Sequence, residues 1–143
     1  MKVLIFGLPG SGKTTLATSF ADLINGVHIN ADTVRTTYND WDFTLEGRIR
    51  QAQRMRYLSD GVVMAGKIAV ADFVCPTETA RKEFAPDFTI WMDTIKEGRF
   101  EDTNALFETP DNVDYHVSKW FNDTHEALLP VINRYMGRDY SGL

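Results

Sequence analysis

An eight-residue segment near the start of the chain constrains the fold more than any other feature. It reads Gly-Leu-Pro-Gly-Ser-Gly-Lys-Thr over positions 7–14 and matches the pattern G-x-x-x-x-G-K-[ST] in full. A nearly all-apolar run at 2–6 precedes it and a helical pattern at 14–23 follows it. Such a loop directs backbone N–H groups at a phosphate, and the helix N-terminus adds its positive dipole end. The segment therefore predicts a nucleoside triphosphate site.

Individual residues of this loop have expected parts in holding the triphosphate. Lys13 is placed to reach the β- and γ-phosphates, and the Thr14 hydroxyl is placed to bind Mg²⁺. ATP and Mg²⁺ are thus the expected cofactors. The nucleotide-binding residues predicted from the segment are Gly7, Pro9, Gly10, Ser11, Gly12, Lys13, Thr14 and Thr15.

Strand and helix patterns alternate along the rest of the chain. The predicted strands are 2–6, 27–30, 67–74, 87–93 and 113–117, and the predicted helices are 14–23, 31–38, 45–59, 77–84 and 118–136, with a polar, irregular stretch at 94–112. This alternation predicts an α/β fold in three layers, with a five-stranded parallel sheet of order 2-3-1-4-5 between helices. With 43% hydrophobic residues among 143, we expect one domain over 1–143.

Composition and missing motifs exclude several classes of protein. The longest apolar runs are far shorter than the roughly 20 residues of a membrane span. The single cysteine excludes an intrachain disulfide, and we expect a reducing, cytoplasmic setting. A net charge of −5 argues against nonspecific binding to nucleic acid. The guanine-reading motif N-K-x-D does not occur, and an assembly ATPase needs more chain, so a phosphotransferase with a small acceptor fits best.

The segment 30–35, Asn-Ala-Asp-Thr-Val-Arg, follows the second predicted strand. Ligands of open α/β sheets lie at the carboxyl ends of the strands, so Asp32 is expected to face the γ-phosphate. A carboxylate there can deprotonate an acceptor hydroxyl or hold water on Mg²⁺. Arg35, one helical turn later, could clamp an anionic acceptor. In the alternative interpretation, Asp32 caps the helix and Arg35 is solvated.

The predicted helix 45–59 and the third strand add further candidates. Arg48 is expected to turn toward the cleft, whereas Arg50 and Arg54 point to the surface. Phe43 either stacks on a planar base or packs at the start of the helix. Asp72, near the end of a buried strand, is placed like a carboxylate that reaches Mg²⁺ through water. The three histidines have no spacing typical of zinc ligands.

Taken together, these segments resemble the adenylylsulfate kinase family. That family carries a phosphate loop followed by D-G-D-N-[VI]-R, F-S-x-x-D-R-x-x-N-I-R-R, F-I-S-P and F-T-G…Y-E-x-P. The corresponding residues here are 7–15, 30–35, 43–44, Arg48, Gln51, Arg54, 73–76 and 107–110. The resemblance covers residues 1 to about 117. It implies transfer of the ATP γ-phosphate to the ribose 3′-hydroxyl of adenylyl sulfate, with a homodimer as one expected assembly.

The resemblance also implies roles for single residues. Asp32 would activate the hydroxyl. The phosphosulfate would be held by Arg35, Arg48 and Gln51. Phe43 and Phe107 would sandwich the adenine, with the backbone of Val74 and Cys75 lining the same pocket.

The chain departs from the family pattern at four places, one of which is Gln51, where the family has Asn. Asn30 stands where the family has the first acid of D-G-D, and Asp72 stands where it has a small residue. The family lid, R-D-x-K-G-L-Y-K-K-A-R, has no counterpart, and only 94–104 spans that region. Lys96 and Arg99 are the candidate cations there, and we expect Arg99 to join Lys13 in stabilising the moving phosphoryl group.

Two other functions stay open. The chain is also similar to polynucleotide 5′-kinase domains, through the loop residues Leu8-Pro9-Gly10-Ser11 and through Asn30. The acceptor of those domains is a nucleic-acid or nucleoside hydroxyl. The shortened lid is also compatible with a nucleotide-binding regulatory protein without catalysis.

Overall fold

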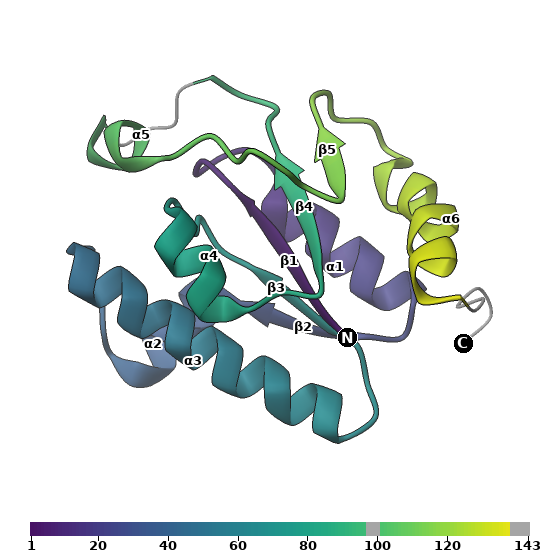
Figure 1. Cartoon of the computed structure of the whole chain (residues 1–143), viewed down its shortest axis with the longest axis horizontal. Coiled ribbons are helices and arrows are strands. Elements are labelled where there is room, and N and C mark those ends of the chain that lie inside the picture. Colours follow the sequence, from purple (N-terminus) through teal and green to yellow (C-terminus); the bar gives the residue numbers. More distant parts are fainter. Residues whose placement is uncertain (97–100, 138–143) are drawn as a thin grey trace.

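The structure is a computed structural model in which residues 1–96 and 101–137 are described. The strands are β1 (Lys2–Gly7), β2 (Val27–Asn30), β3 (Ala69–Asp72), β4 (Phe88–Met92) and β5 (Tyr115–Val117), and the helices are α1 (Lys13–Leu23), α2 (Ala31–Tyr38), α3 (Leu45–Met64), α4 (Glu78–Phe84), α5 (Glu101–Leu106) and α6 (Thr124–Met136). All neighbouring strands pair in parallel, in the order β2-β3-β1-β4-β5 (Figure 1). The predicted five-stranded α/β architecture is therefore confirmed.

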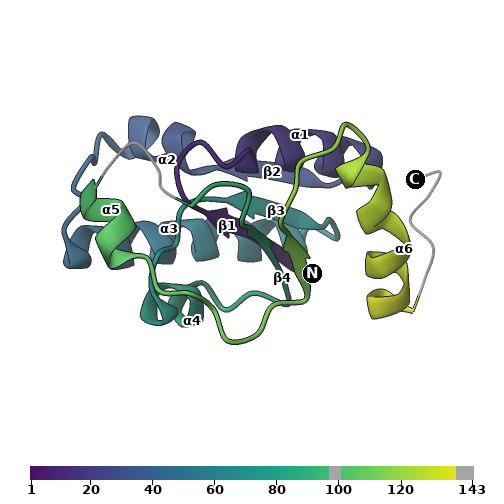
Figure 2. The same cartoon turned by 90° about the horizontal axis from the view of Figure 1, so that it is seen from above.

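The two faces of β1 pack against different sets of helices. Val3 and Ile5 share one buried cluster with residues of α1 and α6. Leu4 and Phe6, which point the other way, share a second cluster with residues of α3 and α4. Figure 2 shows α1 and α4 on opposite sides of the sheet. A central strand that is buried on both faces requires a continuous apolar run, as residues 3–6 provide.

The strand register brings polar residues to one edge of the sheet. Asp72 at the end of β3 lies opposite Ile5 of β1 on one side and Asn30 at the end of β2 on the other. The loop after β1 leads directly into α1 at the same edge. The end of β2, the end of β3 and the glycine-rich loop therefore meet at one place.

Several predicted boundaries differ from the structure. The third helix continues to Met64, beyond the predicted end at 59, because Gly61 is an exposed helical residue and Val62 and Val63 after it pack on the core. Residues 118–123 precede α6 instead of opening it, and α5 lies within the stretch predicted as irregular. Within the described residues, no helix combines the length and apolar character needed to cross a membrane.

Candidate functional site

The glycine-rich loop makes a tight turn between β1 and α1. Gly12 begins α1 with a φ of 97°, which favours glycine. A Cβ on Gly7 would lie 2.4 Å from the carbonyl oxygen of Met92, so β4 leaves no room for a side chain there. Ser11 is buried, and its Oγ has no hydrogen-bond partner among the described residues. An unpaired hydroxyl inside such a loop fits a phosphate oxygen as its partner.

Lys13 is buried at the foot of this loop. Its Nζ donates a hydrogen bond to the carbonyl oxygen of Leu8 at 2.9 Å. Burial lowers the pKa of Lys13 to about 8, while the nearby charges of Asp72 and Asp32 act in the opposite direction. The ammonium group is thus poorly solvated, and a triphosphate would supply the negative charge that it lacks.

A polar cluster joins α1, β2 and β3 beside the loop. The Thr14 hydroxyl donates to Asp72 Oδ1 at 3.0 Å, and Asn30 Nδ2 lies 3.3 Å from each oxygen of that carboxylate. His28 Nε2 pairs with Asp72 Oδ2. Thr14 and Asp72 together offer a hydroxyl and a carboxylate, which are donors that Mg²⁺ accepts when phosphates complete its shell. Among the residues described, no group of three or more His, Cys, Asp or Glu side chains is arranged to hold a metal.

One cavity of about 660 Å³ connects this cluster with the predicted acceptor side. It is lined by Pro9, Gly10, Lys13, Thr14, Asn30, Ala31, Asp32, Trp41, Phe43, Arg48, Asp72, Phe73, Val74 and Thr103. The α2 helix is capped by the Asn30 side chain, which accepts from the Thr33 N–H at 3.0 Å. Asp32 is therefore not the cap: it lies exposed in the first turn, on the wall of the cavity that Lys13 also lines.

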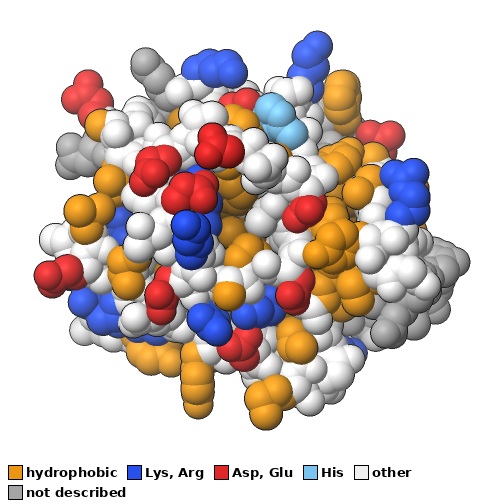
Figure 3. All heavy atoms as spheres, in the orientation of Figure 1, with side chains coloured by type: hydrophobic (Ala, Val, Ile, Leu, Met, Phe, Trp, Pro, Cys, Tyr) orange, Lys and Arg blue, Asp and Glu red, His pale blue; other side chains and the backbone are white. Residues whose placement is uncertain are grey.

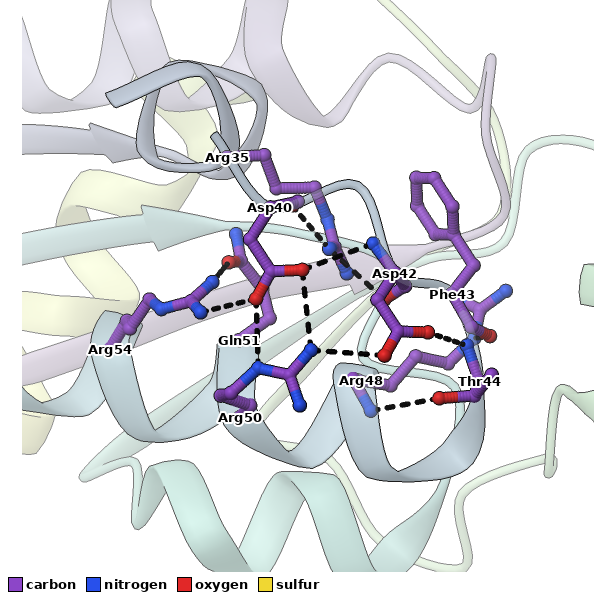
Figure 4. Close-up of polar contacts among 10 residues, drawn as sticks. Arg35, Asp40, Asp42, Phe43, Thr44, Arg48, Arg50, Gln51 and Arg54 are labelled. Carbon is purple, nitrogen blue, oxygen red and sulfur yellow. Dashed lines mark hydrogen bonds and ion pairs between the residues drawn. The ribbon is translucent and has the colours of Figure 1, made fainter. Parts of the chain in front are cut away.

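Ion pairs between α3 and the loop 39–44 form the outer side of the site (Figure 4). Asp40 accepts from Arg50 Nε at 2.8 Å and from Arg54, and Asp42 accepts from Arg50 at 3.0 Å. Hydrogen bonds from Arg50 and Arg54 hold the pKa of Asp40 well below its usual range, and the Thr44 N–H and hydroxyl together with Arg50 lower the pKa of Asp42 to about 2. Arg54 is therefore not the solvated surface residue that helical periodicity predicted.

Arg35 and Gln51 hold protein groups on the acceptor side. Arg35 is buried, and its Nη1 donates to the carbonyl oxygens of Asp40 at 2.9 Å and Asp42 at 3.2 Å. Burial lowers the pKa of Arg35 from its ordinary value. Gln51 Nε2 donates to the Ala31 carbonyl oxygen at 3.0 Å. The alternative of a solvated Arg35 is thus excluded, and both side chains line a second cavity of about 70 Å³ beside the first.

Several of the predicted substrate-binding residues line these two cavities. Asp32, Phe43, Arg48 and Val74 line both cavities, and Cys75 lines the smaller one. Burial raises the pKa of the Cys75 thiol well above its usual range, as expected of a residue that serves packing.

Two exposed aromatic rings stand at the wall of the large cavity. Phe43 is 52% exposed and Trp41 is 50% exposed, with ring centroids 6.4 Å apart. Figure 4 shows the Phe43 ring pointing away from Asp40 and Arg50. Arg48 donates to the Phe43 carbonyl oxygen at 2.9 Å and to Thr103 at 3.2 Å. The loop thus presents flat apolar surface and a cation to the cavity.

Other predicted residues lie apart from this cavity. Phe107 packs on Phe6, with centroids 6.3 Å apart, and on the Arg81 guanidinium at 5.1 Å, and it lines neither cavity. Thr15 is exposed on α1 and also lines neither cavity. Arg99 lies outside the described residues. Sequence patterns gave no site role to Phe73, although it opens the family-like segment 73–76, and none to Thr103, which belongs to no motif.

The visible surface charge is mixed. On the face drawn in Figure 3, acidic and basic side chains are interspersed, and the described residues there form no continuous basic surface. A groove for a nucleic-acid backbone would require such a surface.

Comparisons with known proteins agree with these features. The family model for adenylylsulphate kinase matches residues 1–117. A probable adenylyl-sulfate kinase of Aeropyrum pernix is 39% identical over 85 residues, which make up 55% of this chain and 46% of that protein. This chain therefore spans about half the length of that curated relative.

Solved structures with the same fold include kinases with different acceptors. The APS kinase CysC of Mycobacterium tuberculosis, in complex with AMPPNP and APS, matches with a TM-score of 0.72 at 17% identity, over 92% of this chain and 96% of that chain. A sugar kinase from Janibacter sp. HTCC2649 matches with a TM-score of 0.69 at 21% identity, over 95% and 94%. At these identities the likeness shows the fold alone.

Proposed function

The chain belongs to the adenylylsulphate kinase family, and on this premise we propose that it transfers the γ-phosphoryl group of ATP to the 3′-hydroxyl of adenylyl sulfate. One observation carries this proposal: the phosphate-loop residue Lys13, the carboxylate of Asp32 and the ring of Phe43 line the same cavity. A donor and an acceptor nucleotide could then meet within one cavity.

Phosphoryl transfer requires a base beside the acceptor and positive charge beside the donor. The bond between the γ-phosphorus and its bridging oxygen breaks, and a bond from that phosphorus to the acceptor oxygen forms. The hydroxyl proton passes to the Asp32 carboxylate, which has no hydrogen bond or ion pair to the described residues. Lys13 stabilises the charge on the transferred group, and Arg99 is predicted to assist it.

Thr14 and Asp72 are the residues that would hold Mg²⁺, with Asp32 as a second carboxylate on the same cavity. When bound, the cation would neutralise charge on the β- and γ-phosphates. The donors fit this role because Asp72 is only 2% exposed and one of its oxygens already contacts the Thr14 hydroxyl.

The acceptor would be bound by the loop 39–44 and by α3. Phe43 and Trp41 offer flat surfaces for its base, and Arg48 offers a cation for its phosphosulfate. Arg35 and Gln51, which donate to backbone carbonyl oxygens, would support this surface from behind. In this proposal Trp41 takes the place that the family resemblance gives to Phe107, because Phe107 packs beneath Arg81.

The test is transfer of radiolabelled γ-phosphate to three acceptors: adenylyl sulfate, nucleosides and 5′-hydroxyl oligonucleotides. We expect product with adenylyl sulfate alone, and Lys13→Ala should abolish it. Transfer only to oligonucleotides would instead support the polynucleotide kinase interpretation. Tight ATP binding with no transfer to any acceptor would support a regulatory protein.

A further inference from the structure

The buried Asp72 carboxylate is shared between two neighbours, one of which has no part in the proposed mechanism. Its Oδ1 accepts from the Thr14 hydroxyl at 3.0 Å, whereas its Oδ2 pairs with His28 Nε2. The other ring nitrogen of His28 lies 3.4 Å from Thr18 Oγ1, and the Thr18 hydroxyl donates to the Thr14 carbonyl oxygen at 2.8 Å. The imidazole therefore lies between α1 and β3.

Asn30 completes the environment of the same carboxylate. Its Oδ1 accepts from the N–H and the hydroxyl of Thr33 at 3.0 and 3.2 Å, so its amide nitrogen faces Asp72. That nitrogen lies 3.3 Å from both Asp72 oxygens and 3.3 Å from Thr14 Oγ1. Since residues 30 and 72 are partners in the β2–β3 ladder, a carboxylate at position 30 would repel Asp72. An amide donor is the group that fits beside this acid.

We propose that His28 is a positioning residue for the divalent-cation site: it holds Oδ2 of Asp72 so that Oδ1 remains aimed at the Thr14 hydroxyl. This inference rests on one part of the proposed function, the binding of Mg²⁺–ATP, because it assigns Asp72 to the cation that accompanies ATP. A hydrogen bond to one oxygen of a carboxylate fixes the direction of the other, and such outer partners affect metal affinity strongly. The contact requires the imidazole tautomer that carries a proton on Nε2, since a carboxylate can only accept.

The first test measures ATP binding by calorimetry with and without Mg²⁺. His28→Leu should raise the Kd for Mg²⁺–ATP about 10- to 100-fold. It should change the Kd for metal-free ATP by no more than about twofold. His28→Gln, which retains a side-chain N–H donor, should recover most of the loss. An equal loss in both forms of ATP would indicate a merely structural role and overturn the proposal, as would an unchanged Kd for Mg²⁺–ATP.

His116→Leu is the matched control. It removes another histidine–aspartate pair, His116 with Asp93 at 2.9 Å, whose members do not line the cavities described above. We expect both Kd values to stay within about twofold of the wild type. Circular dichroism of every variant is the check that the fold is retained.

A second test moves the carboxylate from position 72 on β3 to its pairing partner, position 30 on β2. Asp72→Asn should raise the Kd for Mg²⁺–ATP. The double variant Asn30→Asp/Asp72→Asn should recover most of that affinity, because the side chain of residue 30 lies 3.3 Å from Thr14 Oγ1, against 3.0 Å for Asp72 Oδ1. Failure of the double variant to recover would refute the assigned partnership of residues 30 and 72. Both tests measure binding, so a protein that transfers phosphate to no acceptor would refute the proposed function and leave this inference standing.

Discussion

The buried lysine of the phosphate loop makes ATP affinity depend on pH in a defined direction. Burial lowers the pKa of Lys13 to about 8, so the free protein loses this charge in mildly alkaline solution. Bound phosphates favour the charged form and raise the pKa again. Binding above pH 8 must therefore be accompanied by proton uptake, and affinity must fall as the pH rises from about 8 toward the pKa of the bound state.

The size of the effect follows from the fraction of charged lysine. With a pKa of about 8, about 75% of the free protein carries the charge at pH 7.5 and about 3% carries it at pH 9.5. The Kd for ATP should therefore rise on the order of 20-fold across this range. The triphosphate itself does not titrate here, because a phosphate loses its last proton at about pH 6.

The assay is calorimetric titration of metal-free ATP at half-unit steps from pH 7.5 to 9.5, in two buffers of different ionisation enthalpy. The paired buffers report proton uptake directly. Lys13→Arg is the control, since a guanidinium keeps its charge throughout this range. The Kd of this variant for ATP should therefore not depend on pH, whatever its absolute value. A constant Kd in the wild type, or the same slope in the arginine variant, would refute this reasoning.

Three further predictions concern the walls of the site and the fold around it. Phe43→Ala should raise the acceptor KM at least about tenfold, because it removes an exposed ring from the cavity wall. Phe107→Leu should leave that KM within about twofold, as measured by initial-rate kinetics. A larger effect of Phe107→Leu than of Phe43→Ala would show that the base of the acceptor binds at Phe107. Gly7→Ala places a Cβ 2.4 Å from the Met92 carbonyl oxygen and should lower the free energy of unfolding in urea by about 1–3 kcal/mol. Gly61→Ala, with nothing within 4 Å of its Cβ, is the matched control, and an equal loss in both variants would contradict the steric argument. The Asp42 carboxylate, with a pKa of about 2, should stabilise the fold above its ordinary pKa of about 4 and lose this effect as the pH falls toward 2. The difference in Tm between wild type and Asp42→Asn should therefore shrink from pH 5 to about pH 2.5, and a constant difference would show that the charge is not responsible.

The sheet could be predicted because each of its strands has a strong local pattern. Residues 3–6 are apolar throughout, as a strand buried on both faces requires, and the phosphate loop fixes which strand lies at the centre. The end of α3 could not be predicted in the same way. Gly61 looks like a stop signal, but a glycine ends a helix only when it adopts a left-handed conformation, and here the helix continues through it.

The location of a candidate site residue was predictable where it depends on the position of that residue along a strand. Asp72 ends β3 and Asp32 comes two residues after the end of β2, and parallel strands place such residues at one edge of the sheet. Partner choice was harder to predict. The guanidinium of Arg35 could meet an anion or a carbonyl oxygen, and the backbone of the loop 39–42 determines which. His28 was missed because its partner, Asp72, lies 44 residues away and no spacing rule connects them.

The measurement that bears most directly on the account is phosphotransfer by Asp32→Asn, with ATP affinity determined in parallel. Asn keeps the shape of the side chain but cannot take a proton, so turnover with adenylyl sulfate should fall at least about 10²-fold while the Kd for metal-free ATP stays within about twofold. Wild-type turnover in this variant would contradict the role of Asp32 as the base, and a loss of ATP binding would contradict the separation of donor and acceptor sides along one cavity.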